Sequence, residues 1–176
     1  MHRSGDTTDP LILTLALDAD TFARFDGLRR RHFPERLNHI PAHVTLFHHL
    51  PGPEERGVTE AVAALVRTVA APEVAVTGLR FLGRGVAFSL ESEALTGLRA
   101  RLAKAFEGHL TAQDRQGWRP HVTVQNKVEP EAARALHAEL EQGFRPFRFT
   151  APGLILWRYL GGPWAERARF DFGVYT

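Results

Sequence analysis

One tripeptide, His-Val-Thr, occurs twice in this chain, and its residue types can do chemistry on a phosphate. The two copies cover residues 43–45 and 121–123 and start 78 positions apart in a sequence of 176 residues. A proline stands shortly before each copy, at Pro41 and at Pro120, and an apolar residue follows each. A lone His-x-Thr on a strand is most often structural, whereas two copies in matching positions indicate one shared site.

Two imidazoles and two hydroxyls around one phosphate can split or close a phosphodiester without a metal or other cofactor. A neutral histidine takes a proton from the attacking oxygen while a protonated one gives a proton to the leaving oxygen, and an ordinary pKa of about 6.5 makes both forms accessible. Threonine hydroxyls donate to the non-bridging oxygens. We therefore predict His43 and His121 as the acid and the base, in either order, and Thr45 and Thr123 as phosphate ligands.

Half-buried strands must position these side chains, because apolar and polar residues alternate through both copies. Side chains on a strand point alternately to its two faces, so the histidine and threonine of each copy share the face opposite the core. The residues expected on these two polar faces are His43, Thr45 and Phe47 on the first strand and His121, Thr123 and Gln125 on the second. If an approximate twofold axis relates the two halves, both faces meet in one cleft.

The rest of the chain follows the order strand-helix-strand-helix-strand, written twice. Apart from the two motif strands, the expected strands cover residues 11–17, 74–81, 86–90, 145–160 and 166–175. Helical spacing of apolar residues predicts helices around residues 22–28, 58–69, 95–106 and 130–143. We therefore predict an α+β fold of one domain over residues 1–176, with interleaved lobes, mainly antiparallel sheets flanking a central cleft, and pseudo-repeats at roughly 11–81 and 86–160.

The paired His-x-Thr-hydrophobic motifs, His43 to Leu46 and His121 to Val124, resemble those of the 2H phosphoesterase superfamily. The resemblance is to its bacterial and archaeal branch of 2′-5′ RNA ligases and RNA 2′,3′-cyclic phosphodiesterases. It implies a bilobal α+β fold, a metal-independent mechanism, and RNA ends or nucleotides with a cyclic phosphate as substrates. Members of this branch often carry an arginine just past the second motif, where this chain has Gln125 and then Lys127, a point charge that lacks the bidentate geometry of arginine.

Several other residues near the motifs are candidates for substrate contact. Phe47 could stack on a base, and Arg119, Gln125 and Lys127 could contact the substrate. Trp118 and Trp157 fit either base stacking or ordinary packing. Arg29, Arg30 and Arg31 are expected on a solvated helix face, and no metal site is expected from His39, His43, His48 and His49, because alternation puts His48 on the face opposite His43.

Composition limits the remaining choices. The pI is about 9.5 but the net charge is only +2, so charge alone does not indicate a nucleic-acid partner. There is no cysteine, and no apolar run approaches the length of about 18 residues that a membrane helix needs. We expect a cytoplasmic monomer that does not bind membranes. Two rival functions stay open: a 2H relative acting on another diester, such as an ADP-ribose cyclic phosphate or an oligonucleotide 3′ end, and a non-catalytic nucleotide- or RNA-binding module.

Overall fold

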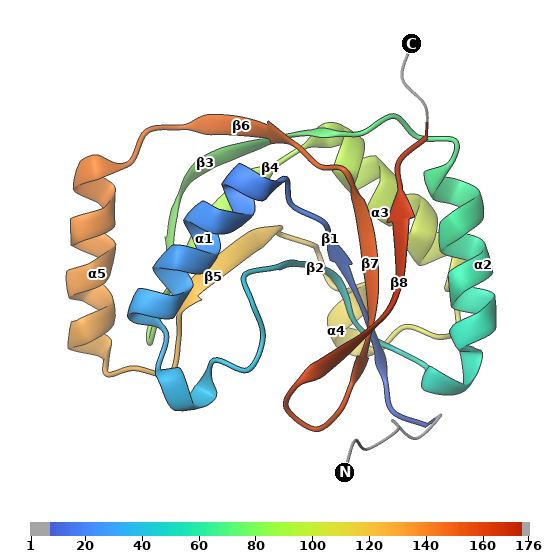
Figure 1. Cartoon of the computed structure of the whole chain (residues 1–176), viewed down its shortest axis with the longest axis horizontal. Coiled ribbons are helices and arrows are strands. Elements are labelled where there is room, and N and C mark those ends of the chain that lie inside the picture. The colour runs from blue at the N-terminus through green and yellow to red at the C-terminus, as the bar shows by residue number, and fades with distance from the viewer. Residues whose placement is uncertain (1–7, 174–176) are drawn as a thin grey trace.

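Two antiparallel four-stranded sheets make up the framework of the computed structural model, which describes residues 8–173 (Figure 1). The first sheet has the order β2-β1-β7-β8 and the second the order β5-β4-β3-β6. The strands of the first sheet are β1 (Leu11–Leu15), β2 (Val44–Leu50), β7 (Gly153–Tyr159) and β8 (Trp164–Asp171). Those of the second are β3 (Glu73–Phe81), β4 (Val86–Glu91), β5 (His121–Gln125) and β6 (Phe147–Thr150).

The helices cover the outer face of each sheet. They are α1 (Ala19–His32), α2 (Glu55–Val66), α3 (Glu93–Ala105), α4 (Ala112–Arg115) and α5 (Pro130–Gly143), with two short 3₁₀ turns at Glu35–Leu37 and Gly52–Glu54. Figure 1 shows α1 and α5 at one end of the molecule and α2 and α3 at the other. Helix α1 packs on β5 and α5 on β3, whereas α2 packs on β8 and on α3.

Local signals in the sequence set the ends of these helices. The Asp18 side chain accepts a hydrogen bond from the amide of Thr21 at the start of α1, and Ser92 does the same for Leu95 at the start of α3. Pro130 occupies the first turn of α5, where its missing N–H has no helical partner to lose. Four basic residues end α1, where they complement the helix dipole.

The lobes interleave because the chain crosses between the sheets. Helix α1 follows β1 of the first sheet in the sequence but packs on β5 of the second sheet. The chain then returns to the first sheet with β2. In the second half, α3 follows β4 of the second sheet yet packs on α2 beside the first. The predicted α+β fold with two antiparallel sheets is confirmed, and each lobe contains segments from both halves of the chain.

The strand expected over residues 145–160 is wrong in one respect. It is two strands, because β6 pairs with β3 of the second sheet and β7 pairs with β1 of the first. Pro152 lies between them, and proline has no N–H for a sheet ladder. The last expected strand corresponds to β8, which ends at Asp171, and residues 174–175 of that expectation lie outside the described residues.

A bulge interrupts the pairing of β2 with β1. Thr14 of β1 pairs with Thr45, and its neighbour Leu13 pairs with Phe47. Leu46 is therefore an extra residue on β2 with no partner position on β1. A second irregularity lies between Phe47 and Leu50. Beyond the bulge the alternation of faces is therefore reversed from the one that the sequence predicts.

Candidate active site

The two motif histidines have the same local geometry. His43 lies directly before β2, and its Nδ1 is 2.8 Å from the carbonyl oxygen of Pro41; His121 begins β5, and its Nδ1 is 2.9 Å from the carbonyl oxygen of Arg119. A carbonyl can only accept, so Nδ1 carries the hydrogen in both rings. In each ring this leaves Nε2 as the nitrogen that accepts a proton when neutral and donates one when charged.

The motif threonines lie on the inner faces of the two sheets. Val44 and Leu46 on β2 are fully buried beneath the helices, as are Val122 and Val124 on β5, whereas Thr45 and Thr123 between them are half-buried on the other face. In the second sheet Thr123 stands in line with Ala87 and Arg80 across three strands. Directly paired residues point to the same side of a sheet, so Arg80 lies on the same face as the second motif.

Burial and nearby positive charges lower the pKa of both motif histidines. The pKa of His43 is lowered to about 4, mainly by burial; the bond to the Pro41 carbonyl opposes this shift, and the positive charges of Arg29, His121 and His48 add to it. Burial also lowers the pKa of His121, with Arg80 and His48 acting in the same direction. His43 is therefore neutral around pH 7.

Arg29 of α1 holds the backbone of the second motif. Its Nη1 donates to the carbonyl oxygen of Thr123 at 2.9 Å, its Nε donates to Asn38 Oδ1 at 2.8 Å, and its guanidinium lies 4.1 Å from the ring centre of Phe33. Only 4% of the residue is exposed, so the expectation that it lies on a solvated face is wrong. Arg29 follows Phe25 by four positions and so shares its buried face.

Trp118 makes the reciprocal link. Its Nε1 donates to the carbonyl oxygen of Thr45 at 2.9 Å, so a side chain just before the second motif holds the backbone of the first. Arg29 holds the backbone of the second motif in the corresponding way, through Thr123. The backbone of each motif threonine is thus held by a side chain from a distant part of the sequence.

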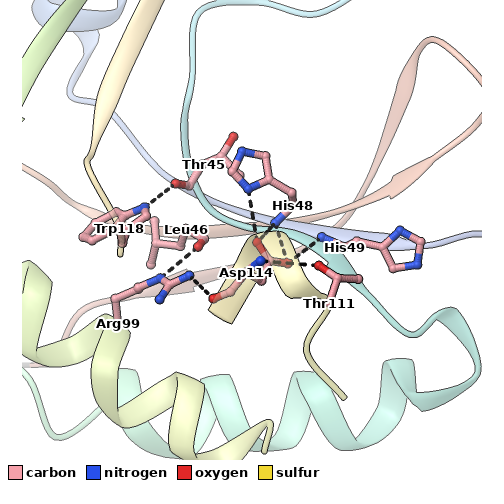
Figure 2. A network of polar contacts seen from close by, with 8 residues as sticks. All are labelled: Thr45, Leu46, His48, His49, Arg99, Thr111, Asp114 and Trp118. Carbon is pink, nitrogen blue, oxygen red and sulfur yellow. Dashed lines mark hydrogen bonds and ion pairs between the residues drawn. The ribbon is translucent and has the colours of Figure 1, made fainter. Parts of the chain in front are cut away.

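A buried carboxylate supports the bulge in β2. Asp114 on α4, 1% exposed, accepts from the amides of His48 and His49 at 2.9–3.0 Å, and its Oδ1 lies 3.1 Å from His48 Nδ1 (Figure 2). Arg99 donates to the carbonyls of Leu46 and Asp114 at 3.1 and 2.7 Å. Sequence analysis missed this cluster, because α4 has only four residues and shows no periodicity.

The structure brings together only part of the predicted substrate-contact set. Phe47 is fully buried and packs edge-on to Phe106, so its prediction as a base-stacking residue is wrong; the bulge turns it into the core. Gln125 is 6% exposed at the far end of β5, about 13 Å along the strand from His121, and Lys127 lies beyond it. Arg119 is exposed beside His121 and lines a polar pocket with Arg80.

An apolar pocket adjoins His43 on the inner face of the first sheet. It has a volume of about 340 Å³, within the usual range for ligand pockets. The ring of Trp164 lies 4.8 Å from the His43 ring and 6.0 Å from that of Trp157, whose Nε1 donates to Thr14 Oγ1. Phe22 of α1, 37% exposed, lines the pocket too. Trp164 was not among the predicted contacts, and it comes from the start of β8, far from either motif in sequence.

Two kinds of feature are absent from residues 8–173. No group of three or more histidine, aspartate or glutamate side chains has an arrangement that could hold a metal ion in this part of the chain. None of its helices combines the length and the apolarity needed to cross a membrane.

Paired His-x-Thr motifs on the facing strands of two antiparallel sheets define the class of 2H phosphoesterases. The chain belongs to the 2′-5′ RNA ligase superfamily, whose family model matches residues 17–163. A search of curated protein sequences finds no match.

Solved structures share the fold. TT0787 of Thermus thermophilus aligns with a TM-score of 0.67 at 18% identity, over 94% of this chain and 100% of its own. E. coli LigT complexed with phosphate aligns with a TM-score of 0.55 at 17% identity, over 94% of this chain and 99% of its own. LigT complexed with 3′-AMP gives 0.54 at 15% identity over the same shares. At these identities the likeness concerns the fold.

Proposed function

We propose that this protein is a metal-independent phosphodiesterase that hydrolyses 2′,3′-cyclic phosphate ends of RNA or nucleotides. The observation that carries the proposal is the matched pair of imidazoles, each with Nδ1 bonded to the carbonyl two residues earlier and Nε2 left for proton transfer. Membership of the superfamily supports phosphoester chemistry. A 5′-hydroxyl in place of water would give a 2′-5′ linkage, which is the ligase direction of the same reaction.

The two histidines then take different roles. His43, in the more desolvated position, acts as the general base and takes the proton of the attacking water at Nε2. His121 acts as the general acid and protonates the leaving ribose oxygen, while the hydroxyls of Thr45 and Thr123 donate to the non-bridging oxygens. One P–O bond forms, one breaks, and the product is a phosphomonoester.

The pH profile of kcat/KM tests these roles. This profile reports the free enzyme, in which His43 must be neutral and His121 protonated. We expect a bell-shaped curve whose acid limb lies near the His43 pKa of about 4 and whose alkaline limb lies below the ordinary histidine value of 6.5. Bound phosphate, an anion, raises both pKa values, so the kcat profile shifts to higher pH. A kcat/KM curve that is flat across this window would refute the assignment.

The apolar pocket beside His43 suits a nucleobase. Trp164 and Trp157 offer aromatic faces within reach of a phosphate held at the motif residues. We expect Trp164→Ala to raise KM for a 2′,3′-cyclic nucleotide about tenfold, because one stacked base is worth about 1–3 kcal/mol. Glycerol 1,2-cyclic phosphate has no base and serves as the control substrate. If KM rises equally for both substrates, Trp164 supports His43 and does not bind a base.

Incubation with 2′,3′-cyclic nucleotides and with short RNA ending in a cyclic phosphate, in the presence of EDTA, tests the function itself. We expect turnover with EDTA present and a 2′-phosphomonoester as product. A panel that also holds an ADP-ribose cyclic phosphate and linear oligonucleotides separates this activity from that of a relative with another diester substrate. Tight binding of a cyclic nucleotide with no product after long incubation would instead identify a binding module.

A further inference from the structure

His48 places a third imidazole on the face of β2 that carries the first motif threonine. The bulge at Leu46 places His48 on the same side of β2 as Thr45, and Figure 2 shows the Thr45 side chain and the His48 ring on that side, with His49 pointing elsewhere. The positive charge of His48 is among the causes that lower the pKa of both His43 and His121. Its side chain is 42% exposed and accessible to a ligand.

A buried acid fixes how this ring is turned. Burial alone would raise the pKa of Asp114, but hydrogen bonds from the His48 ring and from the amides of His48 and His49 outweigh burial and keep that pKa below its usual value. The ionised carboxylate only accepts, so His48 Nδ1 carries a hydrogen, and Nε2 is the nitrogen left for a ligand. The backbone of Asp114 is fixed as well, because its amide donates to the Thr111 hydroxyl and its carbonyl accepts from Arg99.

This support goes beyond what a surface histidine needs. A regular strand directs successive amides to opposite edges, yet the amides of His48 and His49 both donate to Asp114, which the irregular pairing of β2 allows. The same carboxylate that satisfies the bulge therefore also orients the imidazole. Lys127 lies beyond the end of β5 opposite to His121, so its charge is not beside the motif histidines.

We infer that His48, oriented by Asp114, is a third phosphate ligand beside the motif threonines. The inference rests on the proposed function and names a contact of the same site. When protonated, His48 presents Nε2–H to a non-bridging oxygen of the substrate phosphate, next to the hydroxyl of Thr45. The bound anion stabilises the imidazolium, and Asp114 balances the charge on the opposite nitrogen. His48 thereby adds affinity for the phosphate and takes no part in moving the proton of water or of the leaving group.

Binding of inorganic sulfate, measured by titration calorimetry below pH 7, tests this role without turnover. We expect His48→Gln to weaken sulfate binding about tenfold, because a hydrogen bond to a charged group is worth about 1.5–3 kcal/mol. His49→Gln is the matched control; it removes the neighbouring exposed imidazole, keeps the backbone amide on Asp114, and should bind sulfate as the wild type does. Unchanged sulfate affinity in His48→Gln would overturn the inference.

A second measurement covers the case in which His48→Gln is poorly folded. In the wild-type protein, sulfate should shift the ¹⁵N resonance of His48 Nε2 and leave the His49 ring unaffected. Absence of that shift overturns the inference. The test of His48 is separate from the test of the proposed function. If the wild-type protein turns over cyclic nucleotides but its sulfate binding does not depend on His48, only the role of His48 is rejected. Sulfate binding that depends on His48, with no turnover of any cyclic phosphate, rejects the proposed function and leaves an anion site.

Discussion

Replacing His43 or His121 by alanine is expected to lower kcat for 2′,3′-cyclic nucleotide hydrolysis by about 10²–10⁴-fold, the usual contribution of a positioned acid or base. Each variant removes one of the two Nε2 atoms that carry protons, so the surviving histidine cannot take over both tasks. KM should change much less, because the threonine hydroxyls remain. Initial rates at saturating substrate, with the product identified, provide the measurement.

His49→Ala is the matched control for these two variants. His49 is an exposed histidine on β2, its bond to Asp114 comes from the backbone, and we expect its replacement to leave kcat unchanged. The double variant of His43 and His121 should be little slower than either single one, because residues that act as a unit are not additive. Wild-type kcat in either single variant would remove the basis of the proposed mechanism.

Arg29→Met is expected to lower the free energy of unfolding by about 2–4 kcal/mol, since two partly buried acceptors, the Thr123 carbonyl and Asn38 Oδ1, lose their charged donor. The methionine keeps most of the apolar contact with Phe33, so the loss reflects the hydrogen bonds. The variant should also raise the pKa of His43, because the positive charge of Arg29 lowers it. The acid limb of kcat/KM then moves to higher pH. Denaturant unfolding and the pH profile measure the two effects.

Arg30→Met serves as the control one residue further along α1. The Arg30 side chain is 71% exposed and pairs with Asp26 at 3.3 Å on the helix surface, a contact worth less than about 0.5 kcal/mol. We expect neither the stability nor the pH profile of this variant to change. Equal destabilisation in both variants would mean that loss of helical charge, and not the link from Arg29 to the second motif, is responsible.

The fold could be predicted to the level of element order because its signals are local. Ser92 and Pro130 start helices where capping chemistry indicates, and the apolar repeats of α2 and α3 face the core. Nothing local shows that residues 145–160 cross from one sheet to the other, because pairing partners are chosen by the whole fold. Pro152 is the signal that could have divided this segment.

The site was harder to predict because its supports come from distant segments. The alternation rule placed the motif histidines and threonines on polar faces, but it fails beyond Leu46, where an extra residue turns Phe47 into the core and His48 to the face of Thr45. Two adjacent large apolar residues, Leu46 and Phe47, were the available sign of that bulge. The carboxylate of Asp114 reaches His48 from 66 positions away, and no spacing rule connects them.

The pairing of β1 with β7 has a consequence for how the chain folds. Strand β1 is a central strand of its sheet, and residues 11–15 find one of their two pairing partners only in residues 154–158. The two paired segments are therefore separated by most of the sequence. Long-range pairing of this kind slows folding. During synthesis one edge of β1 therefore stays unpaired until the ribosome has released nearly the whole polypeptide. A fragment that stops after β6 would leave that edge exposed and prone to aggregation.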